Sequence, residues 1–131
     1  MVCLDTSFVI DLIRGKSSVE SVVKKLDEES NTICIAAVTV MELVKGAYLS
    51  DNYSVEKEKI DRILSSFVIL EFGKDEASLA GKIEVELIKK GGIIEIADIM
   101  IAATAIKNEE VLVTKNKKHF ERIKELKIES Y

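Results

Sequence analysis

The chain contains very few of the side chains that bind soft or borderline metals. It has one histidine, His119, and two cysteines, Cys3 and Cys34, among its 131 residues. A single histidine cannot build a histidine cluster, and two cysteines within predicted strands are too few for a disulfide framework or a zinc site. We therefore expect any metal to be a hard ion bound by oxygen atoms, which favours Mg²⁺ and also admits Mn²⁺.

Proline is absent, arginine is scarce, and the chain has no long apolar run. Only three of the 19 basic residues are arginines. The dominance of Lys and Glu is typical of hyperthermophiles, whereas the lack of proline is not, so composition leaves the source open. No apolar run approaches the roughly 20 residues that span a bilayer. The N-terminus also lacks the basic segment and cleavage site of a signal peptide, so we expect a cytoplasmic protein without a membrane partner.

The composition that remains is that of a folded, well-solvated protein. Hydrophobic residues make up 47% of the chain and charged residues 32%, which does not suit a disordered chain. The length suits a single domain spanning residues 1–131. The net charge of −4 is not that of a general nucleic-acid-binding protein. A nucleic-acid substrate would therefore require a local basic strip and metal ions.

Short apolar segments alternate with amphipathic ones along the chain. Strands are predicted at residues 1–4, 33–36, 67–70 and 111–113, with a fifth around Ile128. Helices are predicted at residues 6–15, from 17 onward, and at 39–49, 55–64, 74–90, 97–108 and 116–124. Strands that are apolar on both faces and alternate with helices predict an α/β fold with a parallel sheet covered on both sides.

Residues that favour helix starts mark several of these boundaries. The predicted starts are Thr6 or Ser7 for the first helix, the capping boxes Ser17–Glu20 and Thr39–Glu42, and Asn116 for a last helix that reaches Lys124. Gly15 is predicted to end the first helix, and Gly91 with Gly92 the long one.

Three acidic residues lie where predicted strands or loops give way to helices. Asp5 ends the apolar run 1–4, Glu42 follows the second strand, and Asp98 opens the segment 98–105. A carboxylate beside apolar residues costs free energy unless it is paired, capped or bound to a metal. In a parallel sheet, all three could converge at the end where open α/β sheets bind ligands. We interpret Asp5, Glu42 and Asp98 as an acidic site for a divalent metal.

Each acid also has an ordinary structural explanation. Asp5 could cap the first helix, although Thr6 and Ser7 could cap it as well and could instead orient the Asp5 carboxylate. Glu42 completes a capping box, and Asp98 favours the positive end of a helix dipole. The small residues that follow Asp98 predict a slim helix, which would allow this acid to approach the strand ends closely.

The fourth predicted strand is followed by a polar and then a basic segment. Thr114 and Asn116 would lie at the same end of the sheet as Asp5, although they also suit a strand end and a helix cap. The basic strip comprises the RNA-binding candidates Lys115, Lys117, Lys118 and Arg122, together with His119 and Lys124. Such a strip is more often a solvated helix face than a binding site. We expect His119 to be a surface residue rather than a general base.

Four stretches carry a more specific pattern than any single residue. They are Leu4-Asp5-Thr6-Ser7, then Val-Met-Glu-Leu-Val-Lys-Gly-Ala at 40–47, Ala97-Asp98 with Ile-Ala-Ala-Thr-Ala at 101–105, and Leu-Val-Thr-Lys-Asn-Lys-Lys-His-Phe at 112–120. In this order the stretches resemble a PIN domain of the kind found in VapC-type toxins of toxin–antitoxin pairs.

The resemblance implies a three-layer α/β/α sandwich around a short, mainly parallel sheet, and a Mg²⁺-dependent ribonuclease. Asp5, Glu42 and Asp98 match the metal-binding acids of the family. Many members carry a further acid near the last motif, where this chain has Asn116 and His119. This chain therefore lacks the acid that would help to bind a second metal ion in those members. The resemblance also implies a VapB-like antitoxin with a basic tail, and a homodimer.

We expect apolar residues in segments 40–49 and 55–64 to form the surface of that homodimer. The predicted activity is hydrolysis of RNA phosphodiester bonds by metal-activated water, as the endoribonuclease toxin of a type II toxin–antitoxin system. The alternative is a catalytically silent PIN-like module that binds RNA or protein, because the fourth acid is missing. A haloacid-dehalogenase phosphatase fits poorly, since it needs a second acid where this chain has Ser7.

Overall fold

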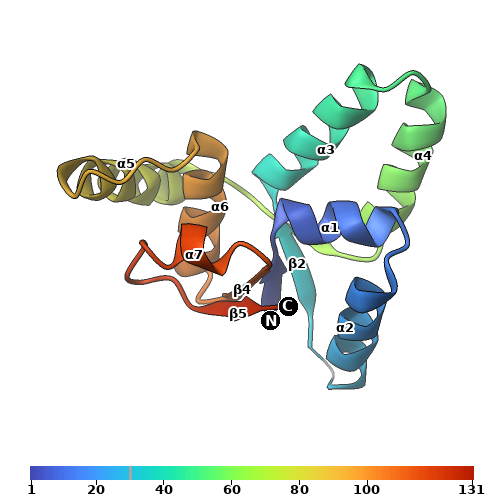
Figure 1. The fold of residues 1–131 in the computed structure, drawn as a ribbon, viewed down its shortest axis with the longest axis horizontal. Helices are drawn as coiled ribbons and strands as arrows, with labels where there is room; N and C mark the ends of the chain where they lie inside the picture. Colours follow the sequence, from blue (N-terminus) through green and yellow to red (C-terminus); the bar gives the residue numbers. More distant parts are fainter. Residues whose placement is uncertain (30) are drawn as a thin grey trace.

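The computed structural model describes residues 1–29 and 31–131, and in these residues five strands form one sheet (Figure 1). The strands are Val2–Leu4 (β1), Ile33–Ala36 (β2), Val68–Leu70 (β3), Val111–Thr114 (β4) and Ile128–Ser130 (β5). Their order across the sheet is β3-β2-β1-β4-β5, and every neighbouring pair is parallel. The predicted α/β class with a parallel sheet is confirmed.

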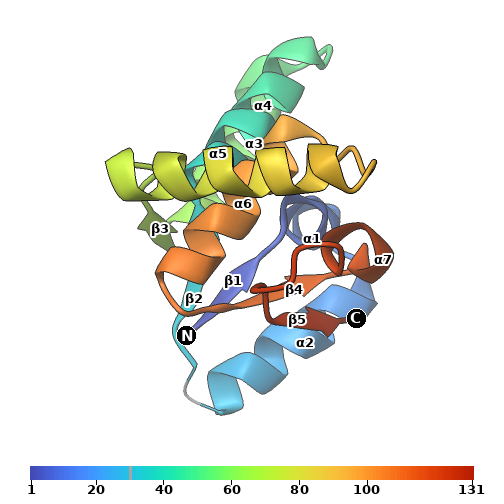
Figure 2. The ribbon, with the colours of Figure 1, turned by 90° about the vertical axis from the view of Figure 1, so that its left-hand side faces the viewer.

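Helices cover both faces of this sheet. They are Thr6–Ile13 (α1), Ser17–Glu28 (α2), Ala37–Leu49 (α3), Tyr53–Leu64 (α4), Lys74–Lys89 (α5), Ile96–Lys107 (α6) and Lys117–Phe120 (α7). Helices α1 to α4 lie on one side of the sheet, and α5, α6 and α7 lie on the other (Figures 1 and 2). This arrangement confirms the three-layer sandwich. Within the described ranges, a helix with both the length and the hydropathy of a membrane span is not found.

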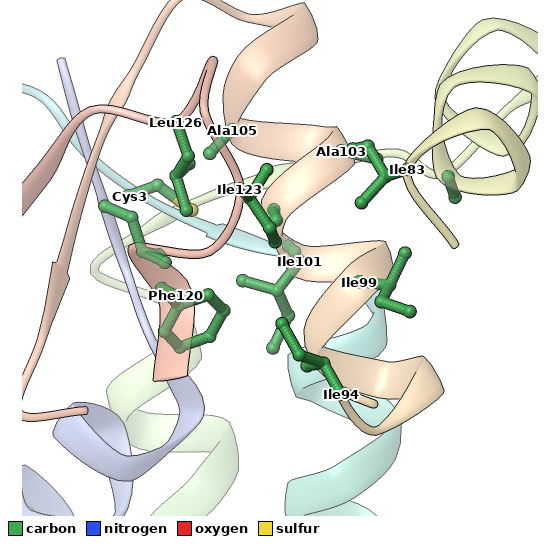
Figure 3. Close-up of a cluster of buried hydrophobic side chains, with 14 of the residues drawn as sticks. Cys3, Ile83, Ile94, Ile99, Ile101, Ala103, Ala105, Phe120, Ile123 and Leu126 are labelled. Carbon is green, nitrogen blue, oxygen red and sulfur yellow. The ribbon is translucent and has the colours of Figure 1, made fainter. Parts of the chain in front are cut away.

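The side chains of β1 fill the cores on both faces of the sheet. Val2 and Leu4 pack on the side of α1, where Phe8 is buried with them. Cys3 points the other way and packs with residues of α6 such as Ile101 (Figure 3). Because successive side chains of a strand point to opposite faces, a strand covered on both sides has to be apolar throughout.

The chain places its strands first on one side of β1 and then on the other. From β1 the chain adds β2 and then β3 on one side, and it later adds β4 and β5 on the other. The carboxyl ends of β1 and β4 therefore form a topological switch point, the usual ligand site of open α/β sheets. Asp5 follows β1 and Thr114 ends β4, so both residues lie at this point.

Helix α6 packs closely because its buried face consists of small residues. Ala102, Ala103 and Ala105 are completely buried, and the helix crosses between the sheet and α5 (Figure 2). The slim helix was predicted from the alanines. Its first turn carries Asp98 toward the strand ends.

The predicted starts of two helices beside the candidate site, α1 and α3, are wrong. Asp5 caps α1 in place of Thr6 or Ser7, because its Oδ1 atom accepts a hydrogen bond from the Thr6 amide. Helix α3 begins two residues before Thr39, so Glu42 lies inside the helix and does not close a capping box. The reason is that β2 runs into α3 without a loop, and the end of the strand sets the helix start.

One further predicted helix start and one predicted helix end are also wrong. Helix α2 begins at Ser17, but its N-cap is Lys16, whose side chain instead pairs with Asp11 of α1. Helix α7 ends at Phe120 rather than at Lys124, because the apolar residues that follow it turn into the core. The glycines after α1 and α5 end these helices as predicted, with left-handed φ angles of 71° and 74°.

Candidate active site

Asp5 lies at the carboxyl end of β1 and is held by three hydrogen-bond donors. It is only 3% exposed. Its Oδ1 atom accepts from the Thr6 amide at 2.8 Å, and its Oδ2 atom accepts from the hydroxyl groups of Ser7 at 3.0 Å and Thr114 at 2.7 Å. These donors offset the free energy of burying the carboxylate and orient it. Ser7 and Thr114 thus both contact Asp5 from different elements.

Glu42 reaches the same region from α3 through a chain of hydroxyl groups. Thr6 Oγ1 donates to Glu42 Oε1 at 2.7 Å and lies 3.0 Å from Thr39 Oγ1. The Thr6 hydroxyl has one hydrogen, which it gives to Glu42, so Thr39 must be the donor to Thr6. This chain joins α1 to α3 beside Asp5.

Asp98 contacts the single histidine of the protein. Its Oδ2 atom lies 2.8 Å from His119 Nε2, with the two side chains 23% and 33% exposed. In the described part of the chain this ring nitrogen forms no well-aligned hydrogen bond, so the contact is an attraction between charges when the imidazole is protonated. His119 lies at the surface, as predicted, but it is only partly exposed and its Nε2 atom faces Asp98. Its neighbour Phe120 is fully buried, which turns the imidazole toward Asp98.

The charges of the other two predicted site acids act on Asp98. Burial, together with the negative charges of Asp5 and Glu42, raises the pKa of Asp98 from 3.8 to about 6, and His119 opposes this rise. We refer to Asp5, Glu42 and Asp98 as the acid cluster. The negative charges near Asp98 therefore disfavour its ionisation unless a cation is near.

The donor atoms of this site suit a hard divalent cation. The acids offer carboxylate oxygens, which Mg²⁺ and Mn²⁺ prefer. In residues 1–29 and 31–131, no three His, Cys, Asp or Glu side chains are grouped closely enough to form a ready-made metal site. The site therefore suits a metal ion by the type and charge of its donor atoms, but these atoms are not already arranged around a metal position.

The basic strip that follows β4 borders the acids. Together with Asn116, its residues Lys115, Lys117, Lys118, His119 and Arg122 line an open hollow of about 500 Å³. The backbone amide of Asn116 donates to Thr114 Oγ1 at 3.0 Å, while its side chain is exposed. His119 belongs both to this hollow and to the acid cluster. Positive and negative groups thus meet at one end of the sheet.

One buried acid near the site was missed by the reasoning from sequence. Asp11 of α1 is 4% exposed, and its Oδ2 atom lies 3.0 Å from Lys115 Nζ. In the sequence Asp11 stands between Ile10 and Leu12. An acid among apolar residues is the same signal that identified Asp5, and it could have been used here.

The chain matches known proteins over nearly its whole length. A family model, PIN domain, matches residues 2–126. Ribonuclease VapC2 from Haemophilus influenzae is 32% identical over 128 residues, which cover 98% of this chain and 96% of that protein. The tRNA(fMet)-specific endonuclease VapC from Shigella flexneri is 31% identical over 128 residues, with 98% and 96% covered. The crystal structure of VapBC2 from Rickettsia felis, bound to a DNA fragment from the promoter, superposes with a TM-score of 0.93 at 32% identity, covering 100% of this chain and 99% of that one. The chain therefore belongs to the PIN-domain family, among the VapC ribonuclease toxins of VapBC toxin–antitoxin systems.

Proposed function

We propose that this chain is an endoribonuclease that hydrolyses RNA phosphodiester bonds with metal-activated water, and that Mg²⁺ is its ion, with Mn²⁺ as a substitute. Nucleases of its family are typically metal-dependent. The observation that supports the proposal is that burial and the charges of Asp5 and Glu42, from two other segments of the chain, raise the pKa of Asp98 to about 6. Such a cluster would repel a phosphodiester unless a cation is bound.

In this proposal Asp5, Glu42 and Asp98 hold the ion and form the catalytic site. A bound Mg²⁺ supplies Lewis acidity, which makes water a better nucleophile and offsets the negative charge of the reacting phosphate. The protein keeps the acids oriented: the Thr6 hydroxyl binds Glu42, and Ser7 and Thr114 bind Asp5. Asn116, at the edge of the site, offers a neutral amide oxygen in the place where many family members have a fourth acid.

Charge indicates which residues would contact the RNA. The candidates for contact with RNA phosphates are Lys115, Lys117, Lys118 and Arg122, all of which line the hollow beside the acids. Because the whole chain has a net charge of −4, RNA binding would depend on this local strip and would weaken as salt rises. We expect the protein to act in the cytoplasm, where such RNA is found.

The test is cleavage of a labelled RNA by the purified chain with Mg²⁺ and with EDTA. Asp5→Asn and Asp98→Asn should each lower the rate at least about a hundredfold, since each removes a carboxylate from the site. Asp51→Asn changes an exposed acid outside the site and should leave the rate unchanged. Equal rates with EDTA, or retained cleavage in both site variants, would overturn the proposal. RNA binding without cleavage would instead support the catalytically silent module.

We further propose that a VapB-like antitoxin binds along the groove between α1, α3 and α4. This hollow of about 280 Å³ is lined largely by the apolar residues Ile10, Ile13, Leu43, Ala47 and Ile60, and it includes Glu42. The related structure from Rickettsia felis is that of a VapBC pair, which supports a partner of this kind. Since Glu42 links the groove to the acid cluster, a basic tail leaving the groove would meet the carboxylates, and an Arg could pair with them.

Exposed apolar side chains support a homodimer. The segments predicted to supply its surface carry exposed Met41, Tyr48, Leu49 and Val55. A second set outside these segments consists of Val85, Ile88, Ile93 and Ile96, and Ile93 is 86% exposed. We propose that this second set forms the twofold interface, because it leaves the side of α3 and α4 open for the antitoxin.

A further inference from the structure

Asp11 is a buried acid that binds side chains from three other parts of the chain. Its Oδ1 atom lies 3.1 Å from Lys16 Nζ, and its Oδ2 atom lies 3.0 Å from Lys115 Nζ. The hydroxyl of Tyr131 donates to the same Oδ2 atom at 3.3 Å. The Tyr131 ring packs edge-on against Phe8, with ring centroids 4.7 Å apart. Asp11 thus joins α1 to the loops after α1 and β4 and to the last residue of the chain.

Lys115 is the partner of Asp11 that lies beside the acid cluster. It directly follows Thr114, whose hydroxyl donates to Asp5 Oδ2 at 2.7 Å. The Lys115 side chain is 44% exposed, so its ammonium group can bind a further acceptor from solvent while Asp11 holds it. Lys117 and Lys118, in contrast, form no ion pair within the described residues. Lys115 is therefore the lysine of the strip whose position the fold restricts.

The two lysines keep Asp11 in its charged form. Burial acts to raise the pKa of the Asp11 carboxyl, but the hydrogen bonds and charges of Lys115 and Lys16 outweigh burial and lower this pKa below its ordinary value of 3.8. Asp11 therefore keeps the negative charge that attracts Lys115. A lysine held in one place in this way loses less conformational entropy when it binds a ligand.

We propose that Asp11 is a positioning residue: it holds the Lys115 ammonium group at the edge of the acid cluster, where it contacts an RNA phosphate next to the one that is cleaved. This inference rests on the proposed ribonuclease function. For RNA affinity, it predicts the opposite of what the net charge alone would predict. Removing the negative charge of Asp11 should strengthen RNA binding if only net charge matters, and should weaken it if Asp11 acts by holding Lys115.

The experiment measures RNA affinity by fluorescence anisotropy in EDTA, and KM and kcat for RNA cleavage in Mg²⁺. We expect Asp11→Asn and Lys115→Ala each to weaken RNA binding about tenfold and to reduce the dependence of affinity on salt by about one phosphate contact. KM should rise by a similar factor, with kcat changed less than about twofold. Asp11→Glu, which keeps the charge, should restore part of the affinity.

Two further variants separate positioning from general effects. Lys16→Ala removes the other ion pair of Asp11 but leaves Lys115 in place, so it should not change KM. In a Lys115→Ala background, Asp11→Asn should have no additional effect on RNA affinity, since both changes remove one contact. Circular dichroism melting curves would show whether Asp11→Asn folds; if it does not, Lys115→Ala, which changes an exposed side chain, still tests the contact.

The inference is overturned if Asp11→Asn binds RNA as well as or better than the unchanged protein, or if Lys115→Ala keeps its affinity. A protein that binds RNA without cleaving it would contradict the proposed function while leaving the affinity measurements as a valid test of Asp11. A protein that neither binds nor cleaves RNA would contradict both.

Discussion

Three side chains of equal charge are held in different ways at the acid cluster. Asp5 accepts hydrogen bonds from an amide and two hydroxyl groups, and Glu42 accepts one from Thr6. Asp98 faces the imidazole of His119 and is partly desolvated. Donors stabilise an ionised carboxylate, and burial beside other anions destabilises it. Asp98 is accordingly an acid whose ionisation costs the fold stability.

Asp98→Asn should make the metal-free protein more stable near neutral pH, although it removes the proposed activity. Because the pKa of Asp98 in the folded state is about 6 rather than 3.8, its stabilising contribution is complete below pH 3.8 and is lost as the pH rises through 6. A neutral Asn avoids that loss, and with solvent screening we expect a gain of about 1 kcal/mol at pH 7.5.

Thermal unfolding in EDTA measures this difference. The melting temperature of Asp98→Asn should exceed that of the unchanged protein by a few degrees at pH 7.5, and the two should converge near pH 4. Asp51→Asn serves as the control and should give no difference at either pH. A gain that is equally large at pH 4 would rule out the ionisation of Asp98 as its cause.

Helices α1 and α3 combine the acid site with the groove. The hydroxyl chain from Thr39 through Thr6 to Glu42 joins them at one end. Farther along α3, Gly46 lines the groove, and a Cβ atom added there would meet nothing within 4 Å. Glycine inside a helix costs about 1 kcal/mol relative to alanine. Gly46 thus keeps the groove open at some expense of helix stability, which is consistent with a partner that fills it.

Gly46→Leu should block the proposed antitoxin without harming the fold. The leucine side chain would occupy the groove, so the affinity for the cognate VapB-like protein should fall at least about tenfold, while the melting temperature stays equal or rises. Gly81→Leu is a matched control, because Gly81 is a helical glycine of α5 with equally open space. Calorimetric titration of both variants measures the effect. Equal affinities would place the antitoxin elsewhere.

The two surfaces proposed to bind partners belong to helices on opposite sides of the sheet, and Figure 1 shows the arrangement of these helices. One is the groove of α1, α3 and α4, and the other is the set formed by Val85, Ile88, Ile93 and Ile96 on α5, α6 and the turn between them. Exposed apolar residues gathered in one region often mark an interface. Two separate surfaces would allow a toxin to pair with its own copy and with an antitoxin at the same time.

The double variant Ile93→Lys/Ile96→Lys should convert the proposed homodimer into a monomer. Both side chains are well exposed, so the fold should tolerate lysine, while like charges facing each other across a twofold axis would repel. Sedimentation equilibrium would show the mass fall by half. Val55→Lys, on the helix predicted from sequence to contribute to the dimer, should leave the mass unchanged. If Val55→Lys gives the monomer instead, the interface lies on α3 and α4.

Patterns within short stretches were sufficient to predict the layers of the fold, and they also identified the three candidate acids. Apolar runs such as 1–4 and 33–36 and the alanines of α6 report burial directly, and Asp5 was visible as an acid at the end of such a run. The capping box at Thr39 to Glu42 was wrong for the converse reason. A local pattern matched, but the direct junction of β2 with α3 left it inside the helix.

The order of the strands and the contacts that depend on it required the folded chain. The pairing of Asp11 with Lys115 joins residues 104 positions apart, and the approach of His119 to Asp98 depends on how α7 and α6 pack at the end of β4. Hydrophobic patterns are local and can be read from neighbouring residues, so they determined the α/β class and the candidate acids. Which charges neutralise one another depends on distances in space, and these exist only once β1 and β4 lie side by side.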